Sequence, residues 1–229
     1  MDINFFWSGD AFDYLNYLTI KSHIKVGHGV VIHLHGDTPK SKYWDRLDNI
    51  TVKDADEIID ISSFMKSGGN FRTASSLWRF KFLYEYGGYY SDCDAVAIKH
   101  WPSNKEWVLC SGDSGMISTG VIKTPPKEEM FLDMMTDIQL EWGNIPVFNQ
   151  HYKIYKGNND PNYKTRNFYP FLWKRWFILL EDLPIPKYVY SVHLFNTMFD
   201  RNNKIKYIEN WIRRNPNTML GRLDAWINE

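Results

Sequence analysis

The segment from residue 70 to residue 98 constrains the fold more than any other part of the sequence. Residues 71–86 carry apolar side chains at helical spacing, with Asn70 as a favourable N-cap and Gly87 just beyond the predicted end. Residues 89–98 then alternate like a β-strand, and Gly87 and Gly88 permit a sharp turn between the two elements. A helix that returns directly to a strand indicates an α/β domain.

Weaker signals on both sides extend this alternation. Strands are predicted at 3–7, 30–34 and 49–52, and a helix that Gly27 ends lies between the first two, which predicts a largely parallel sheet in the N-terminal half. Further along, the pattern predicts strands at 106–110, 116–123 and 188–193, a helix at 128–142, irregular chain at 144–186 and amphipathic segments at 205–212 and 220–227.

Composition narrows the class of protein. A chain of 229 residues with 27 basic and 27 acidic side chains predicts one domain, 1–229, and argues against a dedicated nucleic-acid binder. Two cysteines, Cys93 and Cys110, are too few for a disulfide framework and indicate a reducing compartment. Neither a signal peptide nor an apolar run of about 18–20 residues is recognisable, so we expect a cytoplasmic protein without a transmembrane segment.

Two Asp-x-Asp matches occur, which is the number that chance predicts, so their context must decide between them. Asp54 and Asp56 lie in a run of further acidic residues and read as a solvated edge. Asp92 and Asp94 fall on the predicted strand after the paired glycines, where residues two apart face the same way. Two carboxylates so close together repel each other and favour a bound Mg²⁺ or Mn²⁺ ion.

Arg79 lies on the predicted inner face of the 71–86 helix, together with Ser75, Ser76 and Tyr86. A buried arginine needs an anionic partner, and the partner is either a carboxylate or a phosphate group. The sequence leaves both open: a structural Arg–Asp ion pair beside the turn, or a contact with a phosphorylated ligand.

The order helix, Gly-Gly, strand and Asp-x-Asp, with Arg79 thirteen residues before Asp92, resembles the glycosyltransferases that carry a DXD sugar-binding motif. The α-mannosyltransferase-like and capsular polysaccharide synthesis groups belong here, and the large glucosylating toxins are more distant. The resemblance implies a GT-A-type α/β fold with a mostly parallel central sheet flanked by helices. It also implies a nucleotide-sugar-binding half at 1–100 and an acceptor-side half at 101–229.

The same resemblance implies roles for individual residues. Asp92, Asp94 and His193 would bind Mn²⁺ or Mg²⁺, and Asp92, Asp94 and Arg79 would be the catalytic residues, although a lone histidine at a strand end is often structural. Ser76 stands where the family usually has Asp. The residues expected to contact the nucleotide sugar are Phe6, Trp7, Ser8, Ser75, Ser76, Arg79, Asp92 and Asn196.

The implied activity is metal-dependent transfer of a sugar from a UDP- or GDP-linked donor to a hydroxyl group of a glycan, lipid-linked or protein-linked acceptor. The resemblance implies retention of configuration; an inverting reaction would need a carboxylate base, for which Asp113 and Glu141 are candidates. Polysaccharide biosynthesis in a bacterium or a virus-infected cell fits this activity. Two other functions stay open: a non-catalytic sugar- or nucleotide-binding module, and a metal-dependent nucleotidyl- or phosphotransferase.

Three further features have simpler interpretations. His33 and His35 alternate on one strand, but no further ligand set follows at zinc spacing, so we interpret them as structural. Flanking carboxylates would raise the pKa of the Cys93 thiol and make it a poor nucleophile. The aromatic segment 173–177 is predicted to pack in the core with its two cations in solvent, although contact with an acceptor glycan or with membrane headgroups is the alternative.

Overall fold

A mostly parallel sheet forms the centre of the protein. The computed structural model describes residues 1–111, 116–138, 144–157, 165–202 and 205–229. Within these residues the main sheet has six strands in the order β3-β2-β1-β4-β7-β6. Its first four strands are parallel, and β7 pairs antiparallel with both β4 and β6, so the predicted parallel N-terminal half is confirmed. The strands are β1 (Asp2–Ser8), β2 (Gly29–His35), β3 (Thr51–Asp54), β4 (Gly88–Ser91), β6 (Val108–Ser111) and β7 (Ile117–Thr124).

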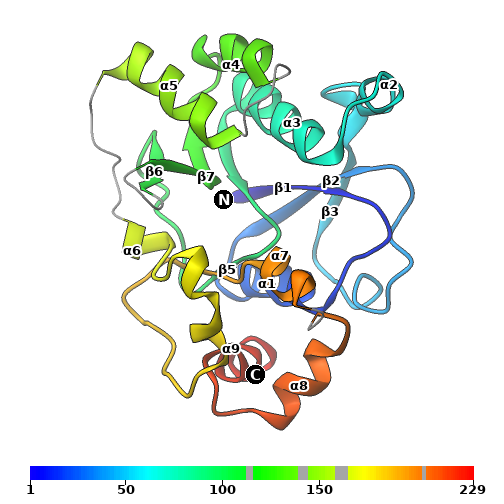
Figure 1. The fold of residues 1–229 in the computed structure, drawn as a ribbon, viewed down its shortest axis with the longest axis vertical. Helices are drawn as coiled ribbons and strands as arrows, with labels where there is room; N and C mark the ends of the chain where they lie inside the picture. The colour runs from blue at the N-terminus through cyan, green and yellow to red at the C-terminus, as the bar shows by residue number, and fades with distance from the viewer. Residues whose placement is uncertain (112–115, 139–143, 158–164, 203–204) are drawn as a thin grey trace.

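Helices cover both faces of this sheet (Figure 1). One face carries α3 (Phe71–Tyr86), α4 (Met130–Ile138) and α5 (Asn144–Lys156), and the other carries α1 (Tyr14–Lys25), α8 (Ile208–Arg214) and α9 (Met219–Asn228). The shorter elements are η1 (Ala55–Glu57), α2 (Ile61–Lys66), α6 (Thr165–Phe168), η3 (Trp173–Leu180), α7 (Asn196–Arg201) and η4 (Ile205–Tyr207). No helix among the described residues is both long enough and apolar enough to span a bilayer.

The α3 helix has the bounds that its sequence predicts. The Asn70 side chain accepts a hydrogen bond from the Thr73 amide at the N-terminus, and Gly87 ends the helix with a φ of 61°. A Cβ atom at Gly87 would lie 2.6 Å from the Pro126 nitrogen, so both the positive φ and the lack of space require glycine at this position. Tyr86, predicted on the inner face, is 64% exposed, because it lies in the last turn and contacts Phe82 rather than the sheet.

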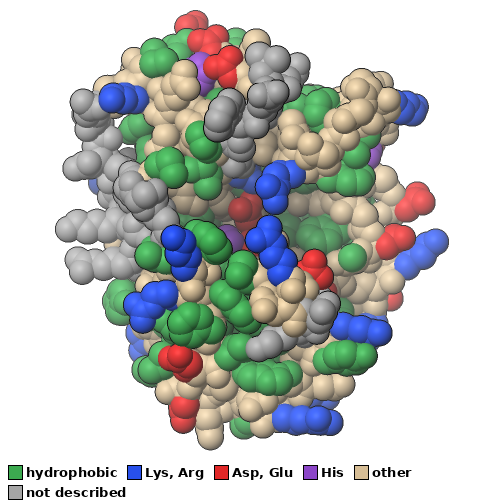
Figure 2. All heavy atoms as spheres, viewed as in Figure 1, with side chains coloured by type: hydrophobic (Ala, Val, Ile, Leu, Met, Phe, Trp, Pro, Cys, Tyr) green, Lys and Arg blue, Asp and Glu red, His purple; other side chains and the backbone are tan. Residues whose placement is uncertain are grey.

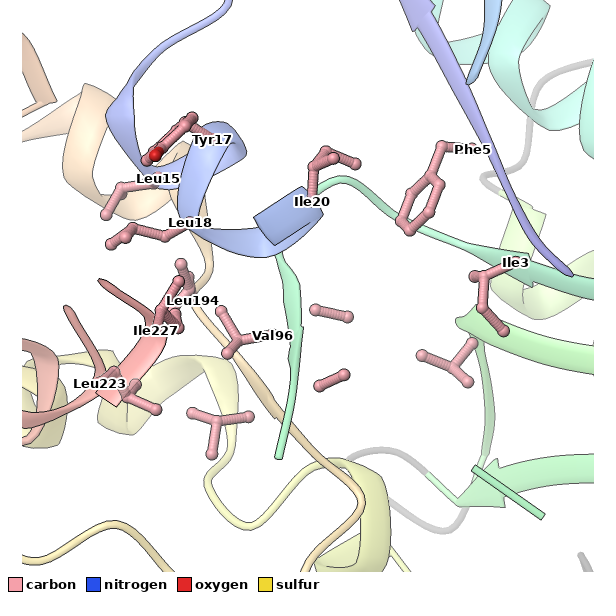
Figure 3. Close-up of a cluster of buried hydrophobic side chains, with 14 of the residues drawn as sticks. Ile3, Phe5, Leu15, Tyr17, Leu18, Ile20, Val96, Leu194, Leu223 and Ile227 are labelled. Atoms are coloured by element: carbon pink, nitrogen blue, oxygen red, sulfur yellow. The ribbon is translucent and has the colours of Figure 1, made fainter. Parts of the chain in front are cut away.

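Two hydrophobic clusters, one on each face of the sheet, stabilise the fold. The first joins β1 to α1 and to the C-terminal helix α9, as Figure 3 shows for Ile3, Phe5, Leu15, Leu18, Leu223 and Ile227. The second packs α3 against α4 and α5 through Trp78, Phe80, Phe131 and Phe148. Much of the aromatic content therefore serves as core.

Two predictions about secondary structure are wrong. The strand expected at 89–98 is interrupted: β4 ends at Ser91, residues 92–94 form a turn, and β5 (Ala95–Ala97) pairs antiparallel with β8 (Ser191–His193) in a separate sheet. The segment 144–186, expected to be irregular, contains α5, α6 and η3. Pro146 concealed the start of α5, yet a proline in the first turn of a helix removes no intrahelical hydrogen bond.

Candidate active site

The candidate site lies where the strand order of the sheet reverses. The chain leaves β1 for β2 and β3 on one side and then returns to β4 on the other side of β1. In open α/β sheets, ligands bind beyond the carboxyl ends of the strands at such a point. A pocket of about 330 Å³ lies there, and Figure 2 shows a hollow near the centre of the face, with acidic and histidine side chains inside it. The residues that line the pocket are Phe6, Trp7, Asp13, Asn16, Ser75, Tyr90, Asp92, Cys93, Asp94, Asn196 and Thr197.

Asp92 is held by two side chains at one of its oxygens. Arg79 Nη2 donates to Asp92 Oδ1 over 2.7 Å, and the Tyr90 hydroxyl donates to the same oxygen over 2.9 Å. The backbone of Asp92 is fixed too, since its amide donates to the Gly120 carbonyl over 2.7 Å. No described residue donates a hydrogen bond to Asp92 Oδ2, so this oxygen remains available to a ligand.

Arg79 is buried, with 4% of its surface exposed. Its guanidinium group donates to Asp92, to the Tyr90 hydroxyl and to the Thr119 carbonyl, and it stacks 4.2 Å from the Tyr90 ring centroid. Burial by itself lowers the pKa of Arg79, but the neighbouring Asp92 and Tyr90 outweigh it and the pKa is raised. Of the two anionic partners that the sequence left open, the carboxylate is the one present. The predicted contact of Arg79 with a donor stays a prediction.

Asp94 and His193 meet although about a hundred residues separate them. Their contact follows from the register of the small sheet, in which Ala95 is opposite His193. His193 Nε2 lies 3.1 Å from Asp94 Oδ1, and the amide of Asn196 donates to Asp94 Oδ2 over 3.2 Å. Burial raises the pKa of Asp94, the His193 ring opposes this, and the charge of Asp92 raises the pKa further.

Asp92, Asp94 and His193 each offer one ligand atom, and these atoms lie within 4.8 Å of one another. Two carboxylates and an imidazole form a donor set that suits Mn²⁺ or Mg²⁺, with water or a ligand in the remaining positions. The three residues therefore fit a divalent metal ion.

The residues predicted to contact the nucleotide sugar divide into two groups. Phe6, Trp7, Ser75, Asp92 and Asn196 line the pocket. Asn196 Oδ1 is buried and has no hydrogen-bond partner among the described residues, so a donor group of a ligand would satisfy it.

Ser8, Ser76 and Arg79 do not line this pocket. Ser76 is 4% exposed, and its hydroxyl donates to the Arg72 carbonyl within the helix. The Ser76 hydroxyl, at the position where the family usually has Asp, therefore already donates its hydrogen bond to the backbone of its own helix.

Asp13 and Asn16 are pocket residues that the sequence analysis missed. Asp13 caps α1 by accepting from the Leu15 and Asn16 amides, and Asn16 Nδ2 donates to the Cys93 carbonyl over 3.0 Å. Burial raises the pKa of Asp13 to about 6; the two amide bonds lower it and the charge of Asp94 raises it. The capping-box spacing of Asp13 and Asn16 predicts a helix start, but nothing local shows that this helix start lies beside Asp94.

Other candidate residues have different environments. His33 Nε2 donates to Asn4 Oδ1 over 3.1 Å, and His35 pairs with Asp56, consistent with structural roles. The pKa of the Cys93 thiol is raised well above its usual value, by burial first and then by Asp92 and Asp94. Asp113 and Glu141, the candidates for an inverting base, lie outside the described residues.

Residues 28–109 match a protein family described as "Glycosyltransferase sugar-binding region containing DXD motif". The matched segment includes α3, the Gly87-Gly88 turn, and Asp92 and Asp94. The predicted enzyme class, a glycosyltransferase, is thereby confirmed. No curated protein matches the sequence.

Solved glycosyltransferase structures resemble the fold. The PaToxG glycosyltransferase superposes with a TM-score of 0.53 at 16% identity, over 69% of this chain and 70% of that one. The galactosyltransferase LgtC, in complex with donor and acceptor sugar analogs, gives 0.43 at 15% identity, over 65% and 69% of the two chains. GlyE of Streptococcus pneumoniae TIGR4 gives 0.49 at 13% identity, over 84% and 54%. The PaToxG match bears out the predicted GT-A-type α/β fold.

Proposed function

We propose that this glycosyltransferase uses a divalent metal ion, Mn²⁺ or Mg²⁺, to move a sugar from a nucleoside-diphosphate donor to a hydroxyl group of an acceptor. The observation that carries the proposal is the convergence of Asp92, Asp94 and His193 at the pocket where the strand order reverses. The family match supports it, because the matched region includes both carboxylates.

Each proposed ligand is oriented by neighbours. Arg79 and Tyr90 hold one oxygen of Asp92, which leaves the other oxygen for the metal. The Phe195 amide donates to His193 Nδ1 over 3.3 Å, which fixes the orientation of the ring. When bound, the ion would stabilise the negative charge of the departing diphosphate as a Lewis acid.

We propose that residues 1–100 bind the donor and residues 101–229 the acceptor. Phe6 and Trp7 would flank the base of a UDP- or GDP-linked donor. Ser75 would offer its hydroxyl to the donor, because the Ser76 hydroxyl already donates to the backbone of its own helix. Asn196 would accept a hydrogen bond from the donor through its buried Oδ1. Retention of configuration, a glycan, lipid-linked or protein-linked acceptor and a place in polysaccharide biosynthesis follow from the family resemblance and belong to the proposal.

A panel of UDP- and GDP-sugars tests the proposal through release of nucleoside diphosphate with Mn²⁺, with Mg²⁺ and with EDTA. We expect release with one donor, its loss in EDTA, and a reduction by more than about 100-fold in Asp94→Asn. Asp45→Asn is the matched control, because Asp45 is exposed and outside the pocket, and it should behave as wild type. Metal-independent release, or full activity of Asp94→Asn, would contradict the proposal.

The products separate the remaining alternatives. A nucleotidyltransferase would release sugar phosphate from the same donors rather than nucleoside diphosphate. A binding module would retain glycan in EDTA, measured by calorimetry, and would release no nucleotide.

A further inference from the structure

The segment around η3 exposes large apolar side chains. Leu172 is 41% exposed, and Trp173 and Phe177 are each 46% exposed. Ile178 and Leu179, by contrast, are buried and anchor the same segment in the core. The sequence-based expectation of core packing is therefore wrong for Trp173 and Phe177, because the buried side of η3 is formed by the residues that follow them.

Cations accompany these apolar side chains. Lys174 and Arg175 are exposed, and neither forms an ion pair with a described carboxylate. Lys174 Nζ lies 5.7 Å from the centroid of the Trp173 ring, so a charge and a large apolar surface are adjacent. Residues 165–180 contain no acidic residue; beyond η3 follow Glu181, which is exposed, and Asp182, which is paired with Arg222 over 2.7 Å. We define the η3 patch as Leu172, Trp173, Lys174, Arg175 and Phe177.

The η3 patch has a fixed position relative to the pocket. Trp176, on the inner side of η3, packs edge-on against Phe199 of α7 with ring centroids 5.0 Å apart. The same helix α7 begins at Asn196, which lines the pocket. In Figure 2, hydrophobic and cationic side chains lie together below and to the left of the hollow, over the yellow segment of Figure 1 that contains η3. The η3 patch and the pocket therefore share one face.

We propose that the η3 patch binds the surface of an anionic lipid bilayer. Trp, Phe and Leu beside Lys and Arg are the side chains that insert at the boundary between headgroups and acyl chains, where cations contact anionic lipids. The formal net charge of the whole chain is zero, so attraction to an anionic surface must be local, and the η3 patch supplies it. Leu172 and Phe177 offer no hydrogen bonds to the hydroxyl groups of a sugar, which favours lipid over glycan as the occupant.

Sedimentation with vesicles tests this without any donor or acceptor, so the outcome does not depend on the proposed sugar transfer. The full chain should bind vesicles of 30% phosphatidylglycerol in phosphatidylcholine, and should bind pure phosphatidylcholine far more weakly. Lys174→Ala with Arg175→Ala should weaken binding about 30-fold, since each cation near such a surface contributes about fivefold. Trp173→Ser with Phe177→Ser should weaken it at least as much.

Matched controls lie elsewhere on the surface. Ile154 is 67% exposed on α5, and Lys40 is exposed outside the η3 patch, so Ile154→Ser and Lys40→Ala should bind as wild type. Thermal unfolding of every variant checks its fold, and the two cation variants change only exposed side chains.

Absence of binding to anionic vesicles, or equal binding by wild type and the η3 patch variants, would overturn the proposal. So would variants that bind vesicles normally but show a higher KM for a soluble acceptor, because the η3 patch would then contact the glycan.

Discussion

Tyr90→Phe is a sharp test of the buried network beneath the candidate site. The Tyr90 hydroxyl accepts from Arg79 Nη2 and donates to Asp92 Oδ1, both over 2.9 Å. Burial raises the pKa of Tyr90 well above its usual value, so the hydroxyl keeps its proton. Phenylalanine retains the ring, its burial and its stacking on Arg79, and removes only this hydroxyl.

The geometry sets the size of the effect. A hydrogen bond to a charged group contributes about 1.5–3 kcal/mol, and the hydroxyl makes two. The sum is an overestimate, because the Asp92 side chain is 32% exposed and water can replace its lost donor, whereas Arg79 keeps Thr119 and Asp92 as acceptors. We therefore expect a loss of about 2 kcal/mol, which lowers the Tm of a chain of this size by about 4–8 °C.

The measurement is urea and thermal unfolding of Tyr90→Phe beside Tyr155→Phe. Tyr155 also donates to a carboxylate, that of Asp133, but at an exposed position without an arginine, so its loss should be below about 0.5 kcal/mol. Tyr90→Phe should also weaken Mn²⁺ binding about 10-fold, since Asp92 loses one of its two constraints, and Tyr155→Phe should not. Equal losses of stability in the two variants would refute the argument that the network is a buried, charge-assisted unit.

Three further variants test the environment of the site. Asp94→Asn should raise the Tm of the metal-free protein, because burial and the charge of Asp92 make the ionised Asp94 unfavourable. The same variant should show no rise in Tm on adding Mn²⁺. A lower Tm of the metal-free variant would contradict the argument from burial and charge. Gly120→Ala would bring a Cβ atom within 2.7 Å of Asp92 Oδ2 and 2.6 Å of Tyr169 Oη. It should therefore lower the free energy of unfolding by about 1–3 kcal/mol and weaken Mn²⁺ binding. Unchanged Mn²⁺ affinity would exclude Asp92 as a ligand. Burial lowers the pKa of His23 to about 4, so as the pH falls the unfolded chain binds a proton at this residue before the folded chain does. The free energy of unfolding should therefore fall between about pH 6.5 and pH 4, by at most about 1.4 kcal/mol per pH unit. Urea unfolding of His23→Gln should lose this part of the pH dependence.

The parts of the fold that the sequence predicts correctly are those that carry local signals. α3 has a side-chain cap at Asn70 and a glycine turn at Gly87, and both ends are where the sequence indicates. The break after Ser91 has no such signal. Residues 89–98 alternate throughout, yet β5 leaves the main sheet to pair with β8 nearly a hundred residues later, and this non-local pairing overrides the local pattern.

That same pairing explains which site residues the sequence could identify. The metal candidates Asp92, Asp94 and His193 were predicted from motif and resemblance, and the register that sets Ala95 opposite His193 brings them together. Asp13 carries only the signal of a helix cap, and its proximity to the pocket arises because α1 begins at the same edge of the sheet. A capping signal reports on its own helix and not on what lies across the pocket from it.

The ion pair of Arg79 with Asp92 depends on which other charges lie near the guanidinium group. Asp92 lies within 2.7 Å of this guanidinium group, which also reduces the repulsion that Asp92 exerts on Asp94. An aspartate at position 76, as in the family that the sequence resembles, would stand three residues before Arg79 on the same helix face and compete for that charge. Ser76 instead donates its hydroxyl to the Arg72 carbonyl and carries no charge. Ser76 therefore adds no charge that could compete with the ion pair between Arg79 and Asp92.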